Sequence, residues 1–451
     1  MSAKTDLEAR FGRAADLLLG ELLPDEFISI DFAGEDSRFL RFNEGRVRQI
    51  GAVEKADVSF TYGRKGKTIY SGFAMSGDEA TDVARATRAL GRARKEAALL
   101  PEDPWQVPPE AAGTSREIFS GKLPSDDRLV DEVLGPGEPL AKAGAAFVGI
   151  HSQGSIARGA ANSKGARHWF ATETFLTDYS AFLANGKAVK SSYAGRDWDG
   201  AEYRRRLEAE KPRLEALTRP ERVIPPGEYR VWLAPDAFAE FMAFFSWRGL
   251  GEKEFREGES SWTALREGRR ALSPRFRLVQ DFSLGVEPRF NELGEVAPER
   301  LTLIEGGRLA NSLVSARSEK QYGVPSNAAP GHEGLRSPAV DAGELDEDAA
   351  LAAVGRGLYI SNLHYLNWSD FESARVTGMT RFACFWVEDG RIVAPIKDMR
   401  FDESMFHLLG EKLAGLSRQR SVVVDSGTYF QRALSGSLLP GLLVEGFTFT
   451  L

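Results

Sequence analysis

Apolar residues follow a helical period at the start of the chain and a strand period soon after it. Residues 5–23 place one apolar stripe on a helix that Pro24 ends, formed by Leu7, Phe11, Ala14, Leu18 and Leu22. Between Phe27 and Met75 short apolar runs alternate with polar residues, and turns at residues 43–45 and 63–66 separate them. This alternating pattern predicts an antiparallel sheet of four or five strands after the first helix.

A second helix is predicted over residues 76–100. Ser76 is its expected cap, because Glu79 follows three residues later as in a capping box. Four prolines between Pro101 and Pro109 then favour an extended connector. The first predicted domain therefore spans residues 1–110.

The alternation of helix and strand patterns repeats in residues 111–219. A helical stretch is expected at 125–143, a β-meander at 145–193 and a charged helix at 200–218. Glycine-containing turns at 162–165 and 185–186 separate the strands of the meander. These residues form the second predicted domain, a central α+β unit.

The remainder of the chain is mainly strand-like. Prolines at 220–226 mark its start, a strand follows at 229–233, and residues 236–245 have a helical pattern. Most of residues 274–318 and 374–451 consist of strand patterns bounded by glycines. The sequence thus predicts an α+β protein, with an N-terminal α/β sandwich-like region of antiparallel sheets followed by a mainly β C-terminal domain at 220–451.

Composition excludes several classes of function. The chain has 451 residues, 42% of them hydrophobic, which is enough for a large core in two or three domains. Its 58 basic and 65 acidic residues are interspersed and give a net charge of −7, so no nucleic-acid-binding face is expected. The first residues show no secretory signal, and no apolar run approaches the roughly 18 residues that span a bilayer. We expect a cytoplasmic protein without membrane association.

The five histidines do not form a recognisable metal motif. A helical zinc site needs two imidazoles at i and i+4 or i+5 with a nearby carboxylate, and no such spacing occurs. The nearest fragment, His332-Glu333, lies among Pro330, Gly331 and Gly334 and is expected in a loop.

The other histidines and the one cysteine fit structural roles. His151 and His168 fall within strand patterns and are expected to be hydrogen-bonded, and His407 has apolar neighbours. His364, beside Tyr365 and Trp368, fits a pocket wall and a packing role equally well. Cys384 excludes an intrachain disulfide, and its aromatic neighbours indicate a buried strand rather than a reactive thiol.

Short motifs occur in a fixed order along nearly the whole chain. They lie at residues 41–47, 63–67, 162–165, 257–261, 279–281, 303–307, 322–323, 386–397 and 438–444. Each is weak alone, but their order and spacing resemble the TldD/PmbA (TldD/TldE) metallopeptidase family. In that family the TldD type carries a helical His-Glu-x-x-x-His motif and a distant cysteine that bind the metal, and the TldE type lacks them.

The resemblance implies where those ligands would fall. The helical motif would lie near residues 243–250, which contain no imidazole and no carboxylate, and the cysteine near residues 425–430, which read Asp-Ser-Gly-Thr-Tyr-Phe. The chain therefore resembles the TldE side, and no catalytic, cofactor-binding or metal-binding residue is assigned to it. We hypothesise that Phe244, Phe245 and Trp247 fill the volume that a catalytic relative uses for the metal.

Three functions remain open at this stage. The resemblance implies a non-catalytic subunit that pairs with a TldD-like metallopeptidase, which would hold zinc or another divalent metal, and helps to process unfolded peptides by strand addition. An alternative is a self-sufficient metallopeptidase or hydrolase with a relocated active site that uses His332, Glu333 or His364. The third is a homodimeric peptide-binding protein.

Overall fold

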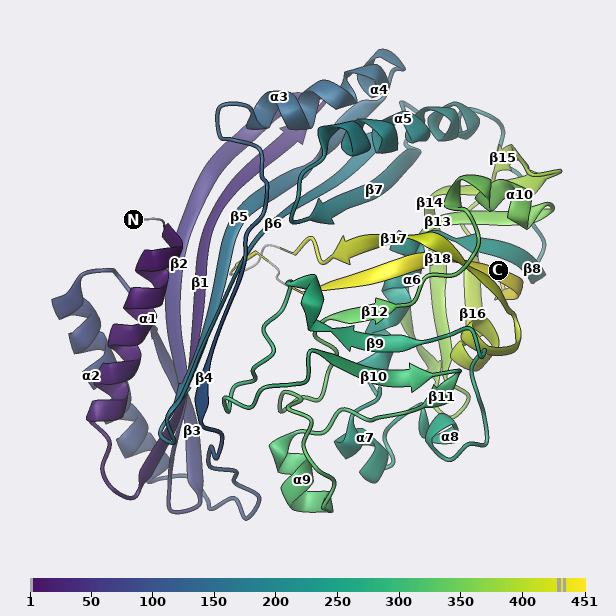
Figure 1. Cartoon of the computed structure of the whole chain (residues 1–451). Coiled ribbons are helices and arrows are strands. Elements are labelled where there is room, and N and C mark those ends of the chain that lie inside the picture. Colours follow the sequence, from purple (N-terminus) through teal and green to yellow (C-terminus); the bar gives the residue numbers. More distant parts are fainter. Residues whose placement is uncertain (1–2, 428–430, 433–434) are drawn as a thin grey trace.

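The computed structural model describes residues 3–427, 431–432 and 435–451, which form two β-sheets with helices packed around them (Figure 1). The first sheet contains β1 (Glu26–Asn43), β2 (Arg46–Arg64), β3 (Lys67–Ala74), β4 (Gly113–Phe119), β5 (Ala146–Asn162), β6 (Ala166–Phe182) and β7 (Ala188–Gly195). Its order is β3-β2-β1-β5-β6-β4, and β7 also pairs with β6. Only the pairing of β4 with β6 is parallel.

The first sheet corrects the predicted number of strands. Three strands, not four or five, occupy residues 27–75, because β1 and β2 each contain two of the short apolar runs in one continuous strand. In β1 the intervening residues keep the ladder to β2, with Gly34 opposite Ala56 and Asp36 opposite Glu54. Glu35 and Ser37 in this stretch are buried although they are polar, since they have partners from the C-terminal part of the chain.

Strands from the first two predicted domains share this sheet. β1 pairs with β5 along fourteen positions, from Ser29 opposite Asn162 to Phe42 opposite Gly149. The division at residue 110 stays a prediction, but the two segments are joined by an unbroken ladder of main-chain hydrogen bonds.

Five helices pack on the first sheet. Helices α1 (Ala3–Gly20) and α2 (Glu79–Ala97) cover one end, and α3 (Leu129–Leu134), α4 (Glu138–Lys142) and α5 (Gly200–Leu217) lie at the other (Figure 1). The helix predicted at 125–143 is interrupted by the 3-10 turn η1 (Gly135–Gly137), because its two glycines and central proline disfavour a continuous helix.

The cap predicted for the second helix is also corrected. Asp78, not Ser76, is the N-cap of α2, and its side chain accepts a hydrogen bond of 2.9 Å from the Thr81 amide. Ser76 instead donates its hydroxyl to Asp82, 2.8 Å away. The Asp78 carboxylate, two residues after Ser76, satisfies a free amide of the first turn equally well.

The second sheet holds most of the C-terminal half. Its strands are β8 (Gly227–Leu233), β9 (Leu278–Asp281), β10 (Arg300–Glu305), β11 (Arg308–Leu309), β12 (Pro338–Val340), β13 (Gly357–Asp370), β14 (Arg375–Glu388), β15 (Arg391–Pro395), β16 (Arg400–Ser404), β17 (Leu413–Val424) and β18 (Gly436–Phe449). β18 pairs with four strands, β8, β12, β16 and β17, and so lies at the centre of the sheet. The α+β class predicted from sequence is confirmed.

Short helices complete this half of the molecule. They are α6 (Pro235–Met242), α7 (Glu252–Arg256), α8 (Thr263–Arg266), α9 (Ala316–Tyr322) and α10 (Ala350–Val354), with the 3-10 turns η2 (Ala243–Phe245), η3 (Phe282–Leu284) and η4 (Glu347–Ala349) and the π-helical turn η5 (His407–Glu411). Helix α6 buries Phe238 and Phe241 against the second sheet. Within the described residues, no helix has the length and apolar character needed to cross a bilayer.

A buried carboxylate links the first sheet to α2 and gives a testable pH dependence. Glu26 accepts hydrogen bonds from Arg94 at 2.7 Å, from the Tyr62 hydroxyl at 2.7 Å and from the Leu23 amide at 3.0 Å. Burial raises the pKa of Glu26, but these hydrogen bonds and the Arg94 charge outweigh it and lower the pKa to about 2.

Glu26→Gln should therefore lower the free energy of unfolding by about 2 to 3 kcal/mol at neutral pH. Because the pKa of Glu26 is lower in the folded chain than in the unfolded chain, its stabilisation is present above about pH 4.5 and is lost as the pH falls toward 2. Urea unfolding measures the free energy of unfolding of both proteins across this pH range, and the two values should converge at acid pH. A difference that stays constant with pH would contradict the assigned ion pair.

Candidate functional site

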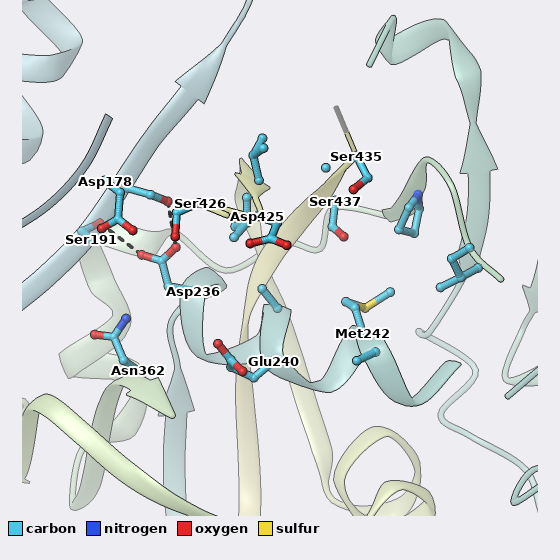
Figure 2. Close-up of a pocket in the computed structure, with 18 of the residues that line it drawn as sticks. Asp178, Ser191, Asp236, Glu240, Met242, Asn362, Asp425, Ser426, Ser435 and Ser437 are labelled. Carbon is cyan, nitrogen blue, oxygen red and sulfur yellow. Dashed lines mark hydrogen bonds between the residues drawn. The ribbon is translucent and has the colours of Figure 1, made fainter. Parts of the chain in front are cut away.

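A cavity of about 520 Å³ lies between the two sheets, with α6 as one wall (Figure 2). We call it the α6 cavity. The first sheet supplies its side through Asp178 on β6 and Lys190 on β7, and the second sheet supplies Asn362 on β13, Val424 on β17 and Ser437 on β18. The cavity is therefore assembled from segments far apart in the sequence.

Helix α6 places two carboxylates in this cavity. Asp236 and Glu240 are four residues apart, so they lie on the same face, opposite the face that packs Phe238 and Phe241 in the core. Asp236 accepts hydrogen bonds of 3.1 Å from the hydroxyls of both Ser191 and Ser192. Figure 2 shows Asp236, Glu240 and Asp425 around the same space.

The electrostatics of the α6 cavity are those of an acidic site. Burial raises the pKa of Asp236, against the opposing effect of its two serine hydrogen bonds. Burial also raises the pKa of Glu240, and the negative charges of Asp236 and Asp425 raise it further. Lys190 is paired with Asp178 at the border of the cavity. The charge of Lys190 acts on both α6 carboxylates, but within the described residues neither of them forms an ion pair.

A second cavity of about 950 Å³ adjoins the first along the inner face of the first sheet. We call it the hairpin cavity, because the β1–β2 hairpin forms much of its wall. Asp178, Lys190 and Ser426 line both cavities. The hairpin contributes two arginines, Arg41 and Arg48, for which the described residues provide no carboxylate partner.

The structure brings together the two segments where the family's metal ligands would fall. Ala243 and Ser246 from the first segment, and Asp425 and Ser426 from the second, all line the α6 cavity. Residues 428–430 of the second segment lie outside the described residues. In the part of the chain that the structure describes, no three His, Cys, Asp or Glu side chains are grouped so that they could hold a metal ion. The described residues at this position do not fit the metal centre that the TldD type carries.

The hypothesis that aromatic side chains fill this volume is wrong. Phe245 stacks on Trp262 at 4.6 Å between ring centroids, and Phe244 packs edge-on against Trp368 at 4.7 Å, both in the core. The side chain of Trp247 is 47% exposed. The η2 turn after α6 points Ala243 and Ser246 into the cavity and the two phenylalanines away from it. Their structural role is confirmed, and the cavity remains open.

Three histidines have the structural partners expected from sequence. His151 contacts the Thr177 hydroxyl at 2.7 Å and the Gln153 side-chain oxygen at 3.2 Å, and burial lowers its pKa to about 4. His168 contacts the Ser115 hydroxyl at 2.8 Å and the Gly294 carbonyl at 3.0 Å. His407 lies 2.8 Å from the buried Glu403 carboxylate.

The residues of the relocated active site do not come together around a cavity. His332 is exposed on a turn, whereas Glu333 is 3% exposed and accepts hydrogen bonds from the Lys253 and Ser315 amides. The His364 ring contacts the Arg381 guanidinium at 3.1 Å and packs on Tyr365, with 4.6 Å between ring centroids. None of these three candidates is among the residues that line the α6 or hairpin cavity.

Cys384 lies on β14 and is 2% exposed, as predicted. Burial raises the pKa of its thiol to about 12, so almost no thiolate is present at neutral pH. We expect the native protein to react with iodoacetamide at least about a hundredfold more slowly than the urea-unfolded protein. Mass spectrometry of the alkylated chain would measure both rates. Equal rates would show that the thiol is accessible.

Comparison with known proteins finds a family match to the C-terminal half and solved structures that share the fold of the whole chain. Residues 226–451 match the model of the PmbA/TldA metallopeptidase C-terminal domain family. TldE from Thermococcus kodakarensis has a TM-score of 0.76 at 15% identity, over 99% of this chain and 100% of its own. No match was found among curated proteins.

Two further solved structures share the fold. A proposed modulator of a DNA gyrase from Thermotoga maritima has a TM-score of 0.73 at 16% identity, over 98% of this chain and 100% of its own. Another proposed DNA gyrase modulator, from Bacteroides thetaiotaomicron, has a TM-score of 0.70 at 13% identity, over 100% and 99% respectively. At these identities the structural likeness establishes the fold.

Proposed function

The chain belongs to the PmbA/TldD metallopeptidase family, and from this premise we propose that it is a non-catalytic subunit of a TldD/TldE-type metalloprotease complex. In this proposal the α6 cavity holds part of an unfolded peptide, while a TldD-like partner carries zinc or another divalent metal and cleaves the peptide. One observation carries the proposal. The two segments that would supply metal ligands meet at this cavity, yet the residues described there include no imidazole and no thiol.

The lining suits binding better than hydrolysis. Metal-dependent hydrolysis needs a bound water whose pKa is lowered from about 15.7 to about 7, which in turn needs a held metal ion. The volume of about 520 Å³ lies within the range of ligand sites in proteins. Val423 and Val424 at the end of β17 form part of the wall. One edge of β17 pairs with β18, and in the described residues the other edge is paired with Leu345 only near Ser417. The unpaired end of this edge can receive an extended peptide through main-chain hydrogen bonds.

The relocated-hydrolase alternative gains no support from the geometry. A catalytic carboxylate has to reach the substrate, whereas the Glu333 carboxylate is buried and bonded to main-chain amides. The homodimeric peptide-binding alternative uses the same cavity, and subunit composition distinguishes it from the proposed complex.

Native mass spectrometry with metal analysis and a peptide-cleavage assay tests the proposal. The chain should be purified alone and after co-expression with a TldD-like chain that contains the His-Glu-x-x-x-His motif. We expect a complex of the two chains in which metal content and chelator-sensitive cleavage depend on the partner. A variant partner that lacks both motif histidines is the matched control and should bind without cleavage.

Two results would contradict the proposal. One is peptide cleavage by this chain alone, abolished by a chelator and accompanied by one transition metal per chain. The other is a stable homodimer that does not associate with the TldD-like chain, which would favour the peptide-binding homodimer.

A further inference from the structure

The two adjoining cavities differ in net charge. Four carboxylates outnumber the cations Lys190 and Arg336 in the α6 cavity, whereas three cations outnumber the single carboxylate of Asp178 in the hairpin cavity. Among the contacts of the described residues, Glu240 has no ion-pair partner, and Asp425 accepts only the Gly427 amide at 2.8 Å. In the hairpin cavity, Arg41 and Arg48 project from neighbouring strands, near the pairing of Arg41 with Gln49. One continuous space therefore has an acidic end and a basic end.

The border between the two cavities is electrically neutral. It is formed by the Lys190–Asp178 ion pair and by Ser426. A paired lysine and aspartate leave no net charge to repel either end of a ligand, and the Ser426 hydroxyl can donate or accept a hydrogen bond. The charge difference therefore lies along the length of the joined space and not across it.

We propose that the joined cavities bind a short extended peptide in one direction, with its charged amino terminus beside Glu240 and Asp425 and its carboxylate end beside Arg41 and Arg48. This inference rests on the proposed function and names the substrate class as peptides with a free amino terminus.

The charges favour this direction over its reverse. An ammonium group has three donors, which Glu240, Asp425 and a neighbouring hydroxyl such as that of Ser437 can accept (Figure 2). Its charge also relieves the repulsion between the cavity carboxylates. In the reverse direction a peptide carboxylate would enter the acidic end, where like charges in a partly desolvated space cost free energy.

The open volume beside η2 provides room for the amino terminus. Ala243 in η2 and Ser246 directly after it line the cavity, and both side chains are small. Since Phe244 and Phe245 pack into the core instead, the space next to Glu240 is not occupied by the chain itself.

Calorimetric titration of the full chain with a pentapeptide of alanine and phenylalanine tests the direction. The probes are the unmodified, amino-acetylated, carboxy-amidated and doubly blocked forms. Loss of one charge-assisted contact is worth about 1.4 kcal/mol or more, so acetylation should weaken binding at least about tenfold. The double variant Glu240→Gln/Asp425→Asn should weaken binding of the unmodified peptide to the same extent and leave binding of the acetylated peptide unchanged.

The basic end is tested in the same way. The double variant Arg41→Gln/Arg48→Gln should weaken binding of the unmodified peptide and leave binding of the amidated peptide unchanged. Glu44→Gln and Arg46→Gln are matched controls, because both residues are exposed on the same hairpin but line neither cavity. Circular dichroism should show that all variants are folded.

The outcomes separate this inference from the proposed function. Equal binding of all four probes, or stronger binding of the acetylated form, would overturn the direction while leaving peptide binding intact. Failure of every probe to bind, both to the chain alone and to its complex with a TldD-like partner, would overturn the inference together with peptide holding.

Discussion

Arg432→Met should lower the free energy of unfolding by about 3 to 5 kcal/mol, because it removes a buried guanidinium that is hydrogen-bonded across the two halves of the molecule. Arg432 lies between β17 and β18 and is 4% exposed. Its guanidinium donates to the Ser37 hydroxyl at 3.2 Å, the Thr174 hydroxyl at 2.7 Å and the Gly154 carbonyl at 2.8 Å, all on the first sheet.

The loss of stability arises mainly from the buried polar groups that the guanidinium contacts in the wild-type protein. Glu35, 2% exposed, accepts the Arg432 amide at 3.1 Å and lies in the field of the guanidinium. Burial lowers the pKa of Arg432 to about 10, which still leaves it charged at neutral pH. Methionine matches much of the length of the side chain and keeps the main-chain amide that donates to Glu35. It would leave three buried oxygens of the first sheet without their donor and the Glu35 carboxylate without the nearby positive charge.

Urea unfolding at neutral pH measures this effect. Arg418→Met, an exposed arginine on β17, is the matched control and should change stability by no more than about 0.5 kcal/mol. In Glu35→Gln/Arg432→Met the loss should be smaller than the sum of the single losses, since the guanidinium lies in the field of the Glu35 carboxylate. Wild-type stability of Arg432→Met would show that the guanidinium does not join the sheets.

Glu333→Ala should be destabilising by about 4 kcal/mol, because the carboxylate accepts three hydrogen bonds in a buried position. One oxygen accepts the Lys253 amide at 2.7 Å, in the first turn of α7. The other accepts the amide and the hydroxyl of Ser315, both at 2.8 Å, at the N-cap of α9. The carboxylate thus joins the amino ends of two short helices, where a negative charge is also favoured by the helix dipoles.

This variant also separates a structural role for Glu333 from a catalytic one. Thermal and urea unfolding should show the loss for Glu333→Ala, a smaller loss for Glu333→Gln, and little change for the exposed neighbour His332→Ala. If Glu333→Ala instead keeps its stability and removes a peptide-cleaving activity of the isolated chain, the hydrolase alternative would stand.

Sequence patterns predicted the elements better than their pairing. The helical stripe of α1, the charged helix α5 and the meander from β5 to β7 follow from local periodicity, so each was recognised. The length of β1 was missed, because Glu35 and Ser37 look like turn residues until Arg432, almost 400 positions later, supplies their partner. The joining of β1 to β5 leaves no local trace either.

The candidate site was only partly predictable. The resemblance located both segments that meet at the α6 cavity, but it suggested a filled volume where the structure has an open one. Asp236 and Glu240 were overlooked, although their spacing of four on a predicted helix could have marked an acidic face. No sequence pattern marked Arg41 and Arg48, since the register of β1 with β2 decides that both residues line the same cavity.

The central place of β18 has a consequence for how the chain matures. This strand is made after β8, β12, β16 and β17, so all four have to wait for it. Until then, those strands present unpaired edges that can associate with other nascent chains. The C-terminal half should therefore fold only once β18 has been made and depend on chaperones, and a premature stop before residue 436 should yield an insoluble product.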